Sequence, residues 1–130
     1  MIEFKNVSKV YDNGSVALDD VCLTINDGEF ILVCGHSGAG KSTLFKLLTH
    51  EVVPDTGTVI VDDFDVTRMK RSKIPKLRRK LGVVFQDFRL LPNKTVAENI
   101  AFALEVIEEK PKIIKEKVSH VLELVGLSDK

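Results

Sequence analysis

The residue types best suited to chemistry lie together in the segment Gly-His-Ser-Gly-Ala-Gly-Lys-Ser-Thr at positions 35–43. This phosphate loop fits the pattern G-x-x-x-x-G-K-[ST], with an apolar run before it and a helical pattern after it. Glycines let successive backbone N–H groups point at one phosphate, and the new helix adds its positive N-terminal end. Lys41 can reach the β- and γ-phosphates, and the Ser42 hydroxyl can ligate Mg²⁺. The candidate nucleotide-binding residues of the loop are Gly35, His36, Ser37, Gly38, Ala39, Gly40, Lys41, Ser42 and Thr43.

Three residues outside the phosphate loop are further candidates. Tyr11 lies 24 residues before Gly35, at an expected strand end, where an aromatic ring can stack on adenine. Val16 can line the adenine edge, and Gln86 follows the apolar run 81–85, where its carboxamide can meet Mg²⁺ and the γ-phosphate. The residues alone favour the simpler interpretations, in which Tyr11 is a turn residue, Val16 an ordinary strand residue and Gln86 a polar residue at a strand end.

Turn signals and apolar periodicity predict the elements that position these residues. Tyr-Asp-Asn-Gly at 11–14 marks a turn between two strands. Thr95 with Glu98 three residues later fits a capping box, and Pro111 begins the last helix. The expected strands are 2–10, 16–25, 29–34, 58–61 and 81–85, and the expected helices are 41–50, a short one within 71–80, 95–107 and 111–125.

Composition and charge narrow the class of protein. The 130 residues suffice for one domain, and no run of 18 apolar residues predicts a membrane span. Cys22 and Cys34 are expected to be buried, reduced thiols, which suits the cytoplasm. The zero net charge hides an asymmetry: residues 1–66 carry 11 acidic and 4 basic side chains, a balance of −7, so residues 67–130 carry +7. The acid-free basic cluster within 68–80 is interpreted as a solvated helix face or as a contact for a polyanion or lipid headgroups.

Tyr11, the phosphate loop and Gln86 together resemble the nucleotide-binding subunit of ABC-type ATPases. The resemblance becomes more specific at Val-Phe-Gln-Asp-Phe-Arg-Leu-Leu-Pro (84–92) and Thr-Val-Ala-Glu-Asn (95–99). These two segments are similar to those of the ABC-type ATPases that act in bacterial cell division. It implies an α/β phosphate-loop NTPase of ABC type that is incomplete, with an antiparallel β subdomain, the start of the parallel-sheet core and part of the helical subdomain. Residues 1–130 are then the N-terminal portion of one ATP-binding domain, with a Q-loop around 86–94 and the start of the helical subdomain at 95–130.

The same resemblance implies a function. The cofactors are ATP or ADP with Mg²⁺, which Ser42 and Gln86 ligate, and Lys41 and Gln86 are the catalytic residues. In the complete protein, two copies form a homodimer through their nucleotide sites and couple ATP hydrolysis to a membrane-protein partner at the cytoplasmic face of the cell membrane, without nucleic acid. The family's acidic strand ending in Asp-Glu, LSGGQ-type signature, D-loop and switch histidine are not found in these residues. We therefore expect this chain to bind nucleotide without hydrolysing it.

Two alternative functions remain open at this stage. Val-Ile-Val-Asp-Asp at 59–63 has the form of a metal-binding acidic strand, so a small phosphate-loop enzyme can use Asp62 or Asp63 to hold Mg²⁺ and activate water. The turn residues around this segment instead favour an exposed hairpin. The other alternative is a stand-alone module that binds nucleotide without turnover. The apolar residues near Gln86 are either core or a groove for a membrane partner's helix: Phe85, Phe88, Leu90 and Leu91.

Overall fold

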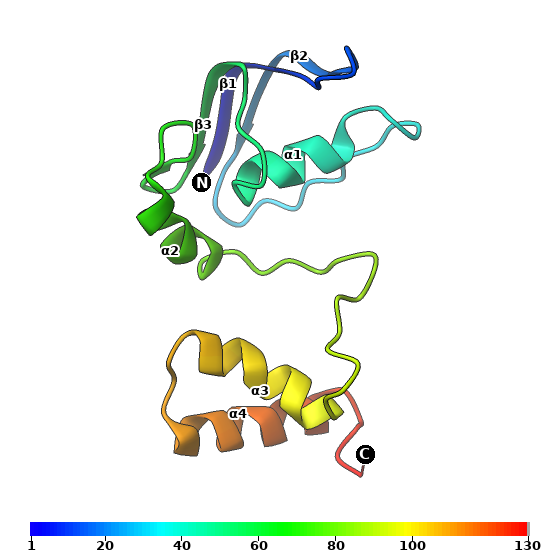
Figure 1. The fold of residues 1–130 in the computed structure, drawn as a ribbon, viewed down its shortest axis with the longest axis vertical. Helices are drawn as coiled ribbons and strands as arrows, with labels where there is room; N and C mark the ends of the chain where they lie inside the picture. The colour runs from blue at the N-terminus through cyan, green and yellow to red at the C-terminus, as the bar shows by residue number, and fades with distance from the viewer. Residues whose placement is uncertain (130) are drawn as a thin grey trace. The chain divides into compact units, whose positions relative to one another are not determined.

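The computed structural model describes residues 1–129, which divide between Gly82 and Val83 into two compact units (Figure 1). The first unit holds the sheet and the phosphate loop, and the second holds two helices. None of the helices within residues 1–129 combines the length and apolar character needed to cross a membrane.

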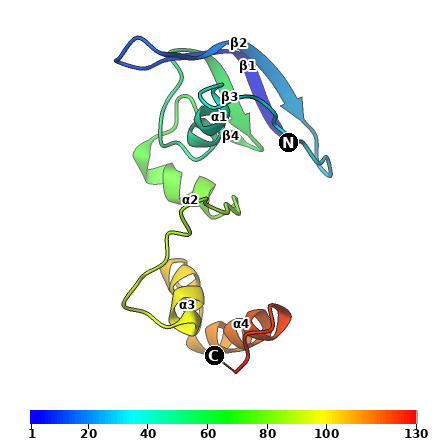
Figure 2. The same cartoon turned by 90° about the vertical axis from the view of Figure 1, so that its right-hand side faces the viewer.

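A four-stranded antiparallel sheet forms the frame of the first unit, in the order β2-β1-β3-β4 (Figure 2). Its strands are β1 (Ile2–Val10), β2 (Val16–Ile25), β3 (Thr56–Val61) and β4 (Phe64–Asp65). The expected turn joins β1 to β2, where the Gly14 amide donates to the Tyr11 carbonyl at 2.8 Å and Gly14 adopts a φ of 79°. Glycine suits this turn because other residues rarely adopt a positive φ. The turn therefore places Tyr11 at one end of the sheet.

The core of the first unit lies between the sheet and α1 (Lys41–Leu48), which packs against it in Figures 1 and 2. Leu47 of α1 is completely buried, as is Leu77 of the short α2 (Ile74–Arg78), which follows the 3₁₀ turn η1 (Arg71–Lys73). The Arg78 guanidinium donates to the Thr49 carbonyl at 3.0 Å, so a positive charge meets the C-terminal end of α1. The buried apolar side chains of this core are Phe4, Val7, Leu18, Leu47, Val59, Val61, Val66 and Leu77.

The second unit is a helical hairpin of α3 (Val96–Val106) and α4 (Pro111–Leu124). The predicted capping box is confirmed: the Glu98 amide donates to the Thr95 hydroxyl at 3.2 Å, and the Thr95 amide donates to the Glu98 carboxylate at 2.7 Å. Pro111 is the first residue of α4, and Gly126 ends it with a φ of 69°. The capping box and Pro111 thus correctly predicted where the two helices begin, although α3 ends one residue earlier than expected.

Two of the expected strands are wrong. Residues 29–40 and 81–85 have no regular strand structure, and Phe30 and Val84 are 91% and 99% exposed. A strand needs a hydrogen-bonded neighbour, and neither segment has one among the described residues.

The expected burial of the two thiols is also wrong, because Cys22 and Cys34 are both exposed. The helix expected within 71–80 is present but short, as η1 and α2.

Candidate nucleotide-binding site

The phosphate loop leads directly into α1 and presents unpaired backbone donors there. Gly38 and Gly40 both adopt a φ of 82°, and Gly40 is the N-cap of α1. Within residues 1–129 the amides of Gly40, Lys41 and Ser42 donate no hydrogen bond, whereas the Thr43 amide already bonds to the Gly40 carbonyl at 2.9 Å. Successive unpaired N–H groups at a helix N-terminus form an anion-binding arrangement. This end of α1 is therefore suited to a phosphate.

The Lys41 side chain folds back over the phosphate loop. Its ammonium donates to the carbonyls of Gly35 at 2.6 Å and His36 at 2.7 Å. An ammonium carries three donors, so one N–H remains for an anion held by the loop amides. The His36 ring also stays within the loop, because its Nδ1 donates to the Ser37 carbonyl at 2.7 Å. The side chains thus brace the loop while its amides stay available.

Gly40 makes a close approach to β2 that the sequence pattern did not reveal. A Cβ built on Gly40 would lie 2.1 Å from the Ala17 carbonyl oxygen and 3.1 Å from the Leu18 side chain. Only a residue without a Cβ fits between α1 and the strand at this point. The phosphate loop is therefore held against the sheet by backbone contact, and Ala17 is a supporting residue that no motif signals.

Tyr11 contacts the last residue of the phosphate loop, while its stacking on adenine stays a prediction. Its hydroxyl lies 3.1 Å from the Thr43 hydroxyl, and Thr43 is only 5% exposed. Val16 is the register partner of Val10, the residue before Tyr11, and is 61% exposed. The structure therefore brings Tyr11, Thr43 and the loop together, with the open side chain of Val16 at the same end of β1 and β2.

Gln86 belongs to the second unit, in the irregular segment between Gly82 and α3, where its side chain is exposed. Phe88 and Arg89 nearby have positive φ values of 54° and 46°, and the Arg89 guanidinium lies 3.8 Å from the centre of the Phe85 ring. Phe88 and Leu90 are exposed, so neither forms part of a core here. The role of Gln86 as a Mg²⁺ ligand stays a prediction.

Asp62 has structural partners. Its carboxylate accepts a hydrogen bond from the Met1 amine at 2.8 Å and pairs with Lys80 at 3.7 Å. The Met1 bond, followed by the charges of Met1 and Lys80, lowers the pKa of Asp62 below its ordinary range. In Figure 1 the N-terminus, whose amine donates to Asp62, lies apart from the loop that enters α1. Asp62 and Asp63 connect β3 to β4, so the hairpin interpretation is confirmed and the small-enzyme alternative is not favoured.

Within the first unit, the candidate protein ligand for Mg²⁺ is the Ser42 hydroxyl of the phosphate loop. No group of three or more His, Cys, Asp or Glu side chains arranged for a metal occurs in residues 1–129. The Ser42 side chain is exposed at the first turn of α1 and makes no hydrogen bond within these residues. Mg²⁺ is commonly held by one or two protein oxygens together with phosphate oxygens and water, so the residues present fit such a site.

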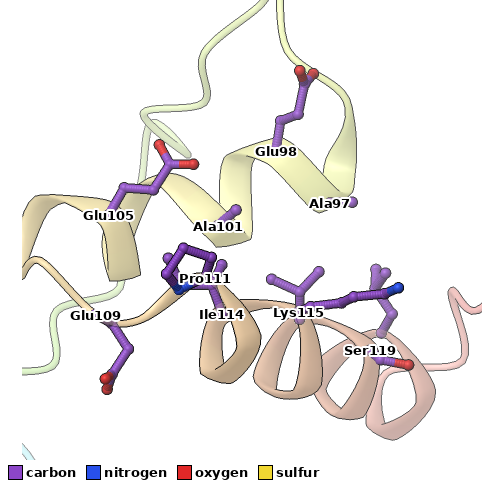
Figure 3. A pocket seen from close by; sticks show the side chains of 11 residues that line it. Ala97, Glu98, Ala101, Glu105, Glu109, Pro111, Ile114, Lys115 and Ser119 are labelled. Atoms are coloured by element: carbon purple, nitrogen blue, oxygen red, sulfur yellow. The ribbon is translucent and has the colours of Figure 1, made fainter.

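A separate hollow lies between α3 and α4 (Figure 3). Its walls include the small and apolar side chains of Ala101, Ile114 and Val118. The carboxylates of Glu98 and Glu105 project from α3 on the side away from α4, and Glu109 also lines the hollow. The lining of this hollow is mainly apolar and includes no glycine-rich loop, so it is not the nucleotide site.

Comparison with known proteins identifies the class. The pattern of the ABC transporter family matches residues 18–130, and the chain belongs to this family. Among solved structures, the ATP-binding cassette MJ0796, a dimer in a post-hydrolysis state bound to ADP and Pi, superposes with a TM-score of 0.83 at 32% identity. That match covers 95% of this chain and 56% of the other. The fold class expected from the sequence is therefore confirmed.

Within the family, the chain is similar to the cell division ATP-binding protein FtsE. It is 52% identical to FtsE of Bacillus subtilis over all 130 residues, which are 57% of that protein. The methionine import ATP-binding protein MetN of Helicobacter pylori (strain ATCC 700392 / 26695) is 44% identical over 130 residues, or 40% of its length. The chain thus spans about half the length of the curated relatives it matches. The sequence resemblance to the ATPases of cell division is confirmed.

Proposed function

We propose that this chain binds ATP or ADP with Mg²⁺ at the phosphate loop, as the N-terminal portion of an FtsE-like ABC ATPase. The observation that carries this proposal is the set of unpaired amides at Gly40, Lys41 and Ser42, in a loop whose carbonyls at Gly35 and His36 hold the Lys41 ammonium. The MJ0796 cassette, 32% identical to this chain, is bound to ADP and Pi, and this supports the choice of nucleotide.

Each site residue has a distinct role in this proposal. The loop amides and Lys41 bind the phosphates, and Tyr11 stacks on adenine beside Val16. Ser42 and Gln86 hold Mg²⁺, which supplies positive charge against the phosphate oxygens when bound. Lys41 stabilises the charge that develops on the transferred phosphoryl group, and Gln86 positions the groups that react with it.

The chain alone is proposed to bind nucleotide without turnover. Asp62 is already engaged by the Met1 amine and Lys80, which supports a structural role for its carboxylate rather than activation of water. General-base positioning typically contributes roughly 10²- to 10⁴-fold to such a reaction. A loop that binds phosphates well can therefore leave hydrolysis barely measurable.

In the complete protein we propose ATP hydrolysis coupled to an FtsX-like membrane partner in bacterial cell division. The relatives named as cell division proteins support this role over methionine import, at 52% against 44% identity. The complete protein would act as a homodimer through its nucleotide sites, at the cytoplasmic face of the membrane. Residues 86–94 would form the Q-loop, and 95–130 would begin the helical subdomain.

Calorimetric titration of Mg²⁺-ADP into the chain tests the binding site directly. Substitution Lys41→Ala removes a charge-assisted contact of about 1.5–3 kcal/mol, so the Kd should rise on the order of 10- to 100-fold. Lys46→Ala is the matched control, since Lys46 is an exposed lysine of the same helix, and its Kd should not change. Equal affinity in wild type and Lys41→Ala would contradict the proposal.

A further inference from the structure

The hydrogen bond between Tyr11 and Thr43 joins two parts of the site that lie 32 residues apart in sequence. The two hydroxyl oxygens are 3.1 Å apart and partly buried. Thr43 belongs to the first turn of α1, and Tyr11 follows the last residue of β1. This side-chain bond therefore ties the end of the sheet to the phosphate loop.

Tyr11 is held at both ends. Its amide donates to the Ser15 carbonyl at 2.9 Å, and its carbonyl accepts from the Gly14 amide at 2.8 Å, so the turn fixes its backbone. The Thr43 hydroxyl then fixes the far end of the ring. A ring that is held at both its backbone and its hydroxyl has lost most of its rotational freedom.

Thr43 is itself a firm anchor. Its side chain is almost completely buried, and its amide bonds to the Gly40 carbonyl at 2.9 Å. Gly40 in turn lies against the Ala17 carbonyl of β2 with no room for a Cβ. The anchor for the Tyr11 hydroxyl is thus part of the same rigid contact that holds the phosphate loop on the sheet.

We propose that the Tyr11 hydroxyl has a positioning role. Through its hydrogen bond to Thr43, it holds Tyr11's own ring, which binds adenine, at a fixed place relative to the phosphate loop. The inference rests on the proposed nucleotide function and extends it from ring stacking to the phenol hydroxyl. Because this bond already orders the ring before nucleotide binds, binding loses little further side-chain entropy at Tyr11. Removing the hydroxyl should then weaken ADP binding by about 2- to 10-fold, the effect expected from one immobilised side chain.

The bond can be observed without any nucleotide, because Tyr11 is the only tyrosine and the chain has no tryptophan. The tyrosine Fermi doublet in the ultraviolet resonance Raman spectrum reports phenol hydrogen bonding and comes from Tyr11 alone. Thr43→Val, which removes the partner hydroxyl and keeps the shape, should change the doublet, whereas Thr43→Ser should retain it. A doublet that is unchanged in Thr43→Val, with far-UV circular dichroism confirming the fold, would overturn the bond.

A double-mutant cycle tests the role in binding. Tyr11→Phe retains the stacking ring and should raise the ADP Kd by about 2- to 10-fold in the wild-type background. In the Thr43→Val background the same substitution should have no further effect, because the hydroxyl has already lost its partner. Equal fold-changes in the two backgrounds would overturn the positioning role. Failure of wild type to bind ADP would instead overturn the proposed function, and the Raman result would still decide the bond.

Discussion

Substituting Gly40 by alanine should destabilise the first unit much more than the same change at Gly38. Both glycines adopt a φ of 82°, so alanine at either position carries a left-handed strain of about 1–2 kcal/mol. Only at Gly40 would the new Cβ also meet backbone, 2.1 Å from the Ala17 oxygen, whereas at Gly38 nothing lies within 4 Å. Forcing extra atoms into a packed contact typically costs about 1–3 kcal/mol, so we expect a total of about 2–5 kcal/mol for Gly40→Ala.

Urea unfolding of the two variants, followed by far-UV circular dichroism, measures this difference. With a slope near 1–2 kcal/mol per molar, the Gly40→Ala midpoint should lie about 1 M below that of Gly38→Ala. Because Gly38→Ala carries the same backbone strain, the difference isolates the contact between the phosphate loop and β2. Equal midpoints for the two variants would refute the close approach of Gly40 to Ala17.

Further predictions concern the caps, the core and the N-terminus. Thr95→Ala removes the capping box of α3 and should lower the free energy of unfolding of the helical hairpin by about 1 kcal/mol, read from its thermal transition. Leu77→Ala empties a fully buried position and should cost about 2–5 kcal/mol in urea unfolding. The hydrogen bonds to Asp27 and Asp62 raise the pKa of the Met1 amine above its ordinary value of 8.0. Since the raised pKa belongs to the folded state, this stabilisation is fully present below pH 8.0 and is lost as pH rises through the folded pKa. N-terminal acetylation should abolish that pH dependence of the unfolding midpoint.

Matched controls separate these effects from general damage. Thr95→Ser keeps the capping hydroxyl and should restore the wild-type transition, and a loss equal to that of alanine would argue against the cap. Leu124→Ala removes the same atoms from a side chain that is 76% exposed, so a cost as large as at Leu77 would contradict the burial argument. An acetylated chain with an unchanged alkaline loss of stability would rule out the Met1 amine as its source.

Features specified by neighbouring residues could be predicted from the sequence. The turn after Tyr11, the start of α1 at Lys41 and the Thr95 capping box all depend on residues close in the chain, and the structure has each of them. The phosphate loop is equally local, because its glycines and Lys41 act within a single segment.

Features that depend on a distant partner could not be predicted. The apolar runs at 30–34 and 81–85 favour strands by composition, but a strand forms only where another strand pairs with it. The Tyr11–Thr43 bond and the contact of Gly40 with Ala17 likewise depend on how α1 lies against the sheet. The phosphate-loop pattern requires a glycine at 40 but does not reveal which backbone atom it meets.

Phosphate release from Mg²⁺-ATP, measured beside ADP binding on the same sample, tests most directly whether this chain binds nucleotide without hydrolysing it. Wild type should bind ADP and release almost no phosphate, and Asp63→Asn should behave in the same way, because Asp63 is an exposed residue of the turn between β3 and β4. Turnover by wild type that disappears in Asp63→Asn would contradict this, and would make the chain a compact enzyme with its own water-activating carboxylate.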